Sequence, residues 1–271
     1  MISKKALTLS IVIPVYNEQH HIKACLDSIK NQTIPPKQVI VVDNNCTDDT
    51  INIVKQYSFV RIVKQPTQGI VFARNAGFDA VKSELIGRID ADTILPNNWV
   101  ERVLGFYGNS VHTDEALTGG GYFYNFRLPR LNGWMFSQLA YRFNRLFIGH
   151  YILWGSNMAM PKEMWQAVKD SVCLREEFHE DIDLALHCHK MGYKITYDET
   201  LRVGVKLKRV WEDRWQQSAH LNRWPTTLKA HGYSLWWMGS IGNKLLPLVG
   251  EPFFVVSEGL ARAFGRSKLP K

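Results

Sequence analysis

The chain has 271 residues, of which 45% are hydrophobic and 21% are charged, and its formal net charge is +8. This composition excludes a disordered chain and fits one large domain, or one domain with an appendage. The scattered cysteines form no Cys-x-x-Cys pair, which argues for reduced thiols in a cytoplasmic protein rather than a disulfide framework or a zinc site. No uncharged apolar run reaches about 18 residues, so no membrane-spanning helix is expected.

Strand and helix signals alternate regularly through the first third of the chain. Short apolar runs predict buried strands, and apolar residues at helical spacing predict the helices between them. We expect strands at residues 9–14, 39–42, 59–63 and 85–89, and helices at 18–31, from Thr47 or Asp48 through Tyr57, and at 69–80. Strands that alternate with helices of about a dozen residues form βαβ units, so the fold class is α/β with a mostly parallel sheet.

After Pro96 the alternation becomes less regular. Residues 117–126 predict a strand entered through a glycine-rich turn, and residues 134–148 have apolar positions at helical spacing. Residues 153–160 are strand-like, and a helix is expected from Pro161. A last clear helix runs from His179 to Met191, where Gly192 ends it. Acidic residues in its first turn are favourable there because of the helix dipole.

Two aspartates one residue apart, Asp90 and Asp92, end the fourth predicted strand. Ligands bind beyond the carboxyl ends of strands in open α/β sheets, and period-two alternation puts both carboxylates on one side. Two hard oxygen ligands suit Mg²⁺ or Mn²⁺, which shares its shell with substrate phosphates. The alternative for an isolated Asp-x-Asp is a turn or a cap for the next helix.

Basic and aromatic residues are concentrated near the C-terminus. The basic side chains between Arg202 and Lys229 outnumber the acidic ones, and tryptophans are interleaved with them. An interrupted apolar run follows at residues 245–256. Such a segment suits an anionic membrane surface, a phosphorylated acceptor or nucleic acid. The alternative is a solvated helix face over a tryptophan-rich core.

Several short motifs occur in an order that resembles the family 2 glycosyltransferases. The order is Ile11-Val12-Ile13-Pro14-Val15-Tyr16-Asn17-Glu18, Val42-Asp43-Asn44, Gly69 with Ala73-Arg74-Asn75-Ala76-Gly77, Asp90-Ala91-Asp92, Gly155-Ser156-Asn157, and Glu180-Asp181-Ile182-Asp183-Leu184. The resemblance covers about residues 9–205. It implies a GT-A fold, a nucleotide-diphosphate sugar donor, a divalent cation (Mn²⁺ or Mg²⁺) and transfer with inversion at the anomeric carbon.

The resemblance also implies a division of the chain. We expect a GT-A catalytic domain at residues 1–205, with its nucleotide-binding half at 1–100 and its acceptor-binding half at 101–205. Residues 206–271 would form a helical C-terminal extension that contacts the acceptor or the membrane surface. A UDP-sugar is the favoured donor, with GDP- or dTDP-sugars as alternatives. We expect the acceptor to be a glycan or a lipid-linked molecule, and the protein to work at the inner face of the membrane.

The matching positions indicate roles for individual residues. The nucleotide-sugar site comprises Pro14, Tyr16, Glu18, Asp43, Asn44, Gly69, Arg74 and Asp90. Tyr16 offers a face for stacking, and Arg74 could bind the base or a phosphate through its forked guanidinium. Many relatives carry an aspartate where this chain has Asn44, which leaves the choice of base open. The acceptor site comprises Trp154, Gly155, Ser156, Asn157 and Glu180.

The chemistry of sugar transfer assigns two further roles. A metal at Asp92, supported by Asp90, neutralises the leaving diphosphate. The resemblance implies that Asp90 also serves the ribose. A carboxylate must take the proton of the acceptor hydroxyl, and Asp181 is our candidate because a helix N-terminus favours its anionic form. His187 and His189 flank Cys188, but residues two apart on a helix point in different directions, which argues against a shared metal.

Two other functions compete with glycosyl transfer. A nucleotidyltransferase that makes activated sugars also uses a βαβ nucleotide site, but the expected glycine-rich, arginine-containing loop is absent around residues 16–21. A binding module for nucleotides or nucleic acid would explain the basic tail but would have no use for Asp181. We therefore expect a glycosyltransferase that does not bind nucleic acid.

Overall fold

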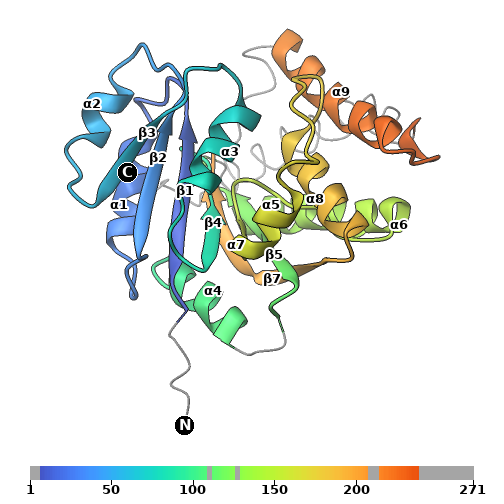
Figure 1. Cartoon of the computed structure of the whole chain (residues 1–271), viewed down its shortest axis with the longest axis horizontal. Helices are drawn as coiled ribbons and strands as arrows, with labels where there is room; N and C mark the ends of the chain where they lie inside the picture. The colour runs from blue at the N-terminus through green and yellow to red at the C-terminus, as the bar shows by residue number, and fades with distance from the viewer. Residues whose placement is uncertain (1–6, 109–111, 126–128, 207–213, 238–271) are drawn as a thin grey trace, which may run out of the picture.

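The computed structural model describes residues 7–108, 112–125, 129–206 and 214–237 (Figure 1). The strands in chain order are β1 (Leu9–Val15), β2 (Gln38–Asp43), β3 (Val60–Lys64), β4 (Leu85–Arg88), β5 (Glu115–Phe123), β6 (Met158–Pro161) and β7 (Lys194–Val205). They form one seven-stranded sheet in the order β3-β2-β1-β4-β6-β5-β7. The α/β fold predicted from the sequence is confirmed.

Helices fill the connections between the strands. They are α1 (Ile22–Lys30), α2 (Thr50–Val54), α3 (Ile70–Asp79), α4 (Trp99–Gly108), α5 (Pro129–Ser137), the π-helix η1 (Gln138–Phe143), α6 (Asn144–Ile148), α7 (Lys162–Val168), α8 (Glu180–Lys190) and α9 (Arg214–Ala230). Among these described helices none has the length and hydropathy to cross a membrane.

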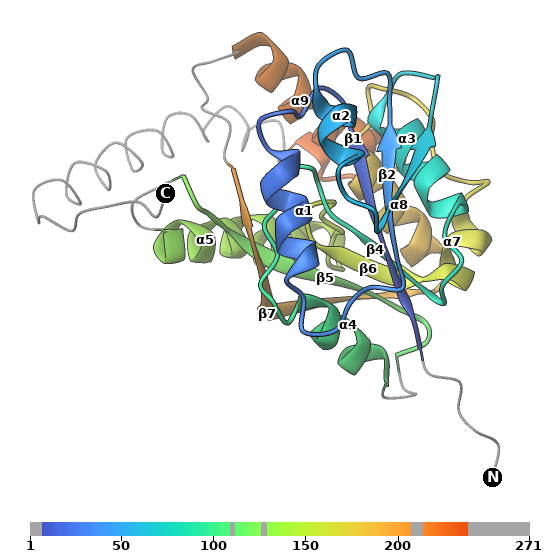
Figure 2. The same cartoon turned by 90° about the vertical axis from the view of Figure 1, so that its left-hand side faces the viewer.

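The first four strands are parallel, and β1, β2 and β4 are buried on both faces. Strand β1 lies between β2 and β4, with Val15 opposite Asp43 and Val12 opposite Arg88. Ile11 and Ile13 pack into a core with α1, α2 and α4, whereas Val12 packs on the other face with α3, α7 and α8. Figure 2 shows α1 and α3 on opposite sides of these strands. The carboxyl ends of β1, β2 and β4 therefore meet at one edge.

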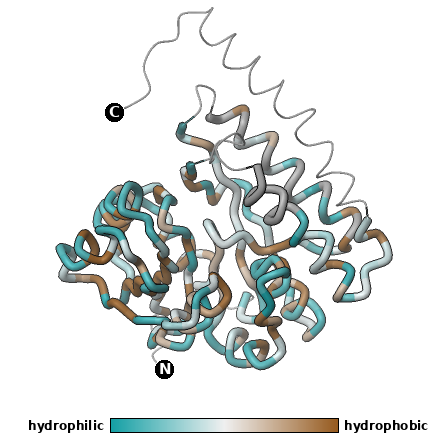
Figure 3. The backbone as a smooth tube through the Cα atoms, turned by 90° about the horizontal axis from the view of Figure 1, so that it is seen from above, coloured by the Kyte–Doolittle hydropathy of each residue, from teal (hydrophilic) through white to brown (hydrophobic). Residues whose placement is uncertain are grey.

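The second half of the sheet is mixed. Strand β6 runs antiparallel to both β4 and β5, while β5 and β7 are parallel. A third apolar cluster joins α6 to α8 and α9 through Ile148, Ile182 and Leu228. Apolar and hydrophilic stretches alternate along the helices in Figure 3, which is the pattern of helices that bury one face.

Several element boundaries differ from the sequence predictions. Helix α2 begins at Thr50 after Asp49, not after Thr47 or Asp48, and it ends before Tyr57. The strand expected at residues 153–160 starts only at Met158. Helix α4 was not predicted, although its buried residues Trp99, Val100, Val103 and Tyr107 have helical spacing. Propensity alone sets such boundaries poorly because tertiary contacts override it.

The C-terminal cluster is described only in part. Lys208, Arg209, Trp211 and the apolar run at residues 245–256 lie outside the described residues. Strand β7 ends at Val205, and Trp224 and Trp236 pack against the third apolar cluster. The first described part of the expected extension thus packs against α6 and α8.

Candidate active site at the carboxyl edge of the sheet

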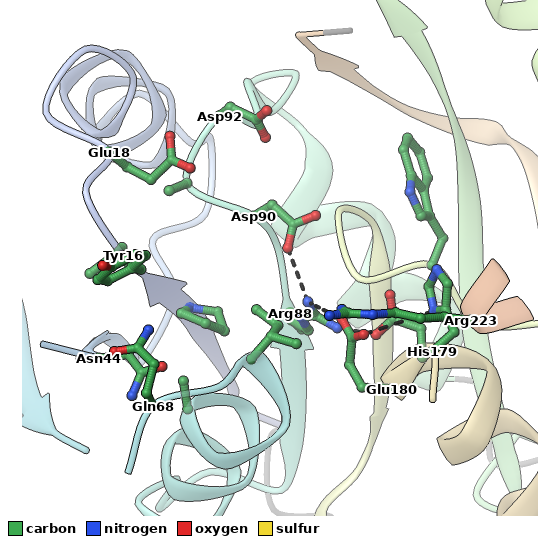
Figure 4. A pocket seen from close by; sticks show the side chains of 17 residues that line it. Tyr16, Glu18, Asn44, Gln68, Arg88, Asp90, Asp92, His179, Glu180 and Arg223 are labelled. Atoms are coloured by element: carbon green, nitrogen blue, oxygen red, sulfur yellow. Dashed lines mark hydrogen bonds and ion pairs between the residues drawn. The ribbon is translucent and has the colours of Figure 1, made fainter. Parts of the chain in front are cut away.

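A cavity of about 480 Å³ opens where β1, β2 and β4 end (Figure 4). Its walls come from these strand ends, the first turn of α3, the first turn of α8, a loop before β6 and one side chain of α9. The lining residues are Pro14, Val15, Tyr16, Glu18, Asn44, Gln68, Ile70, Ala73, Arg88, Asp90, Ala91, Asp92, Trp154, His179, Glu180, Asp181 and Arg223. Parts of the chain that are far apart in sequence therefore build one site.

The β1 and β2 side of the cavity holds the residues predicted to bind a nucleotide. Tyr16 is 51% exposed, so its ring is available for stacking. Asn44 is buried: its Nδ2 donates to the carbonyls of Gln65 and Thr67, and its Oδ1 accepts from the backbone N–H of Gly69. Asn44 therefore fixes the loop that leads into α3, and only part of its surface faces the cavity.

Three predicted nucleotide ligands lie outside this cavity. Asp43 accepts the backbone N–H of Cys46 through Oδ1 at 2.9 Å. Gly69 begins α3 at a φ of 135° and lines a smaller neighbouring cavity. Arg74 is fully buried, and its Nη1 donates to the backbone carbonyl of Glu180 at 2.6 Å. Arg74 does not line the cavity, and its side chain attaches α3 to the first turn of α8.

Arg88 occupies the centre of the site, and the sequence analysis did not select it. The side chain is 2% exposed, and its Nη2 lies 3.1 Å from Asp90 Oδ1 and 3.2 Å from Glu180 Oε1. Its Nη1 donates to Asp181 Oδ1. The backbone N–H of Gly155 donates to the other oxygen of Asp181 at 2.7 Å. A buried arginine thus joins the end of β4 to the start of α8.

The pKa values of the two acidic residues that begin α8, Glu180 and Asp181, are shifted in opposite directions. Burial raises the pKa of Asp181 to about 7; Arg88 opposes this rise and repulsion from Glu180 adds to it. Burial alone would raise the pKa of Glu180 as well. The positive charges of His179, when it is protonated, and of Arg88 outweigh this effect and lower the pKa of Glu180 to about 2. Asp181 is therefore the stronger base of the pair.

Asp90 and Asp92 both line the cavity, as predicted from their position after β4. Asp90 is already bonded on both oxygens: Oδ1 faces Arg88, and Oδ2 accepts the hydroxyl of Ser156. In Figure 4 the side chain of Asp92 lies on the side of Asp90 away from Arg88, across from Glu18. Carboxylates beside an open cavity fit a hard divalent cation that keeps waters and binds phosphate.

The predicted acceptor residues divide into two groups. Trp154 and Glu180 line the cavity, whereas Gly155, Ser156 and Asn157 stand behind it. Asn157 is fully buried; its Nδ2 donates to the carbonyls of Gly120 and Leu201. These three residues support the site and do not line it.

Gln68, His179 and Arg223 line the cavity although the sequence analysis did not place them in the site. His179 precedes α8, and its backbone N–H donates to Thr227 Oγ1 of α9. Arg223 lies one turn before Thr227 on α9, so this contact holds Arg223 beside the cavity. Sequence spacing could not reveal this, because α9 and α8 meet only in the folded chain.

Comparison with known proteins decides the family. Residues 10–168, more than half of the chain, match the family described as glycosyl transferase family 2. The chain belongs to glycosyltransferase family 2. This membership decides among the three functions considered from the sequence in favour of the glycosyltransferase.

Individual relatives agree with this family but match only in part. The putative glycosyltransferase EpsH of Bacillus subtilis is 30% identical over 105 residues, which are 37% of this chain and 30% of EpsH. The chondroitin synthase of Pasteurella multocida is 32% identical over 130 residues, 42% of this chain and 14% of the synthase. The matched region spans less than a third of either relative.

Solved structures of GT-A glycosyltransferases have the same fold as this family 2 enzyme. The mannosyltransferase PcManGT of Pyrobaculum calidifontis, solved with GDP-Man and Mn²⁺, has a TM-score of 0.65 at 17% identity, covering 98% of this chain and 78% of PcManGT. TarS of S. aureus, solved with UDP-GlcNAc, has a TM-score of 0.54 at 17% identity, covering 75% and 59%. The predicted GT-A fold is confirmed.

Proposed function

We propose that this family 2 glycosyltransferase moves a sugar from a nucleotide-diphosphate donor to an acceptor hydroxyl, with inversion and with the help of a divalent cation. One observation carries the proposal. A single cavity is lined by a carboxylate suited to a metal, Asp92, and by a second carboxylate with a raised pKa, Asp181. The two come from different elements, so one can serve the leaving group while the other serves the acceptor.

The donor occupies the β1 and β2 side in this proposal. Tyr16 stacks on the base, and Glu18 accepts a hydroxyl or a base N–H. The diphosphate then extends toward Asp90 and Asp92. Similar structures were solved with GDP-Man and with UDP-GlcNAc, so a donor screen must include both bases. A UDP-sugar remains our first choice from the sequence.

Charge development explains why the leaving group needs a metal. Cleavage of the sugar–phosphate bond builds negative charge on the diphosphate and positive character at the anomeric carbon. A cation held by Asp92, with support from Asp90, would neutralise the developing negative charge. Asp90 would support the cation mainly by lying close to it, because its two oxygens are already bonded to Arg88 and Ser156.

Asp181 takes the acceptor proton in the same proposal. Proton transfer is most efficient when the base has a pKa near the working pH, and the pKa of Asp181 is about 7. Glu180 is a poor base because its pKa is lowered to about 2. Arg88 and the N–H of Gly155 hold both oxygens of Asp181, which leaves further lone pairs for the acceptor hydroxyl. Attack from the Asp181 side of the sugar, opposite the diphosphate, produces inversion.

The acceptor and the location of the enzyme belong to the same proposal. We place the nucleotide-binding half at residues 1–100, the acceptor-binding half at 101–205 and an extension at 206–271. Trp154 and Glu180 lie on the acceptor side, and a glycan or lipid-linked acceptor suits the basic and aromatic C-terminal segment. Peripheral contact with an anionic leaflet at the cytoplasmic face would bring the enzyme to such an acceptor.

The test measures donor turnover and donor binding separately. UDP-, GDP- and dTDP-sugars are screened with Mn²⁺, and the best donor is used with the Asp181→Asn variant. We expect this variant to bind the donor with nearly unchanged affinity and to lose transfer, because the amide cannot accept the proton. Asp170→Asn, an exposed carboxylate after α7, is the matched control and should retain full activity. Loss of donor binding in Asp181→Asn would place this residue in the donor site and overturn its role as base.

A further inference from the structure

A second group of metal-ligating side chains lies outside the catalytic cavity. Four side chains each offer one ligand atom, and these atoms all lie within 4.8 Å of one another: Cys173, Asp183, His187 and His231. Cys173 follows α7, Asp183 and His187 lie one turn apart on α8, and His231 directly follows α9. We propose that these four side chains form a structural zinc site that fastens α9 to the catalytic domain.

The distances within the group are close to those of a tetrahedral site. His231 Nε2 and His187 Nε2 lie 2.8 Å and 3.5 Å from Asp183 Oδ1, and Cys173 Sγ lies 3.9 Å from His187 Nε2. Zinc–ligand bonds of about 2.0–2.3 Å at tetrahedral angles separate the ligand atoms by about 3.2–3.6 Å. These three separations lie within about 0.5 Å of the tetrahedral values, and the other separations, which reach up to 4.8 Å, must shorten by up to about 1.2 Å for all four atoms to bind one ion.

The ligand chemistry selects zinc over the cation proposed for the catalytic cavity. A thiolate and two imidazoles suit Zn²⁺, whereas Mg²⁺ and Mn²⁺ prefer carboxylate and water. One thiolate and one carboxylate balance the charge of Zn²⁺, which lowers the cost of burying the ion. The Asp183 side chain is fully buried and the His231 side chain is 5% exposed, whereas Cys173 and His187 are partly exposed. Four protein ligands indicate a structural rather than a catalytic zinc.

Zinc binding requires two proton changes in this site. The Cys173 thiol must lose its proton to solvent, because the thiolate is the ligand. Without metal, His231 Nε2–H donates to Asp183 while Nδ1 lies 2.9 Å from Lys190 Nζ. In the zinc complex Nε2 of His231 and Nε2 of His187 both bind the ion, so the ring proton of each imidazole is on Nδ1. The exposed Lys190 ammonium then turns into solvent.

The site has a consequence for the catalytic cavity. Helix α8 carries Asp181 at its start and the zinc ligands further along, while α9 carries Arg223 beside the cavity. A zinc ion at the end of α9 would add to the existing attachments of this helix, which are the bond between the His179 N–H and Thr227 Oγ1 and the packing of Leu228 against α8. The ion thus keeps Arg223 in place without touching substrate.

Metal analysis of the full-length protein tests the site directly. We expect one zinc per chain after equilibrium dialysis against zinc. Cys173→Ser and His231→Gln should each weaken zinc binding by more than about 100-fold, since loss of even an outer-shell partner costs about 10–100-fold. His189→Gln is the matched control. His189 lies on α8, as His187 does, but its ring stacks on His150 and it is not one of the four proposed ligands. It should bind zinc as the wild type does.

Cobalt substitution identifies the ligands even if a variant folds poorly. Co²⁺ in the wild-type protein should give the intense visible bands of tetrahedral coordination and a thiolate-to-cobalt charge-transfer band. Zinc-free protein should also exchange the amide hydrogens at the end of α9 faster, with β1 unchanged. Absence of stoichiometric zinc in the wild type, or a cobalt spectrum without a thiolate band, would overturn the proposal. Asp92→Asn should leave zinc content unchanged, so this outcome is independent of the catalytic proposal.

Discussion

A single methyl group at Gly155 perturbs the ion pairs that hold the proposed base. A Cβ atom at this position would lie 2.3 Å from both Cζ and Nη1 of Arg88. Carbon contacts in proteins lie near 3.5–4.0 Å, so the guanidinium must move by about 1 Å. Arg88 is a long side chain, so the backbone can stay in place. The cost then falls on the ion pairs of Arg88, above all the one with Asp181.

The displacement predicts a specific kinetic defect. Misplacing a catalytic group by about 1 Å costs on the order of 10²-fold in rate, or about 2.7 kcal/mol of transition-state stabilisation. Arg88 also opposes the rise in the pKa of Asp181. When Arg88 moves away, that pKa rises further and the base is protonated at neutral pH. We expect the defect of Gly155→Ala to be largest near pH 7 and smaller near about pH 9.

Steady-state kinetics across pH, together with donor binding and thermal unfolding, distinguish this account from misfolding. Gly155→Ala should bind the donor with near wild-type affinity and remain folded. Gly105→Ala in α4 is the control, because a Cβ there meets no atom within 4 Å. It should retain full activity. An equal loss for Gly155→Ala at both pH values, or wild-type rates at neutral pH, would refute the role of Arg88 in positioning Asp181.

Three further outcomes are expected. Asp92→Asn should abolish transfer and weaken donor binding more in Mn²⁺ than in EDTA; full wild-type activity in EDTA would exclude the metal role. The wild-type rate should fall as pH drops below about 7, because the base must be ionised and burial raises the pKa of Asp181; a flat profile down to about pH 5 would exclude Asp181 as that base. The full chain should float with anionic liposomes and lose this association in high salt, whereas a chain that ends before Arg202, and so lacks the basic and aromatic cluster, should not float; recovery of the full chain only in the soluble fraction would contradict membrane docking.

Local patterns predicted the first half of the fold well for a physical reason. Strands such as residues 39–42 are buried on both faces and therefore appear as continuous apolar runs. Strand order and direction carry no such signal, because β6 pairs with β4 and β5 through distant backbone hydrogen bonds. The π-helix η1 was likewise not predicted, since its wider turn depends on surrounding packing.

The residues of the two sites divide in the same way: a local sequence signal identifies some of them, and only contacts between distant segments bring the others together. Asp90 and Asp92 could be placed at the cavity because each follows a strand directly. Arg88 also had a local signal that the sequence analysis passed over: it is a charged residue in an apolar strand, two positions before Asp90 and hence on the same side. The group of Cys173, Asp183, His187 and His231 had only the helical spacing of Asp183 and His187 as a local signal, since Cys173 precedes α8 and His231 follows α9. Cysteine spacing alone argued against zinc, and only the fold brings Cys173 to two histidines.

The burial of Arg88 explains why the aspartates after β4 and the acidic pair at the start of α8 occur in one chain. A buried cation is tolerated only with well-placed partners, and removing one partner of a buried pair costs about 3–5 kcal/mol. Asp90, which follows β4, is one partner of Arg88. Glu180 and Asp181 in the first turn of α8 are two more. Closing the fold around Arg88 therefore brings together the proposed metal side and the proposed base side of the cavity. Arg88 couples them electrostatically, because each carboxylate that it neutralises affects the proton affinity of the others.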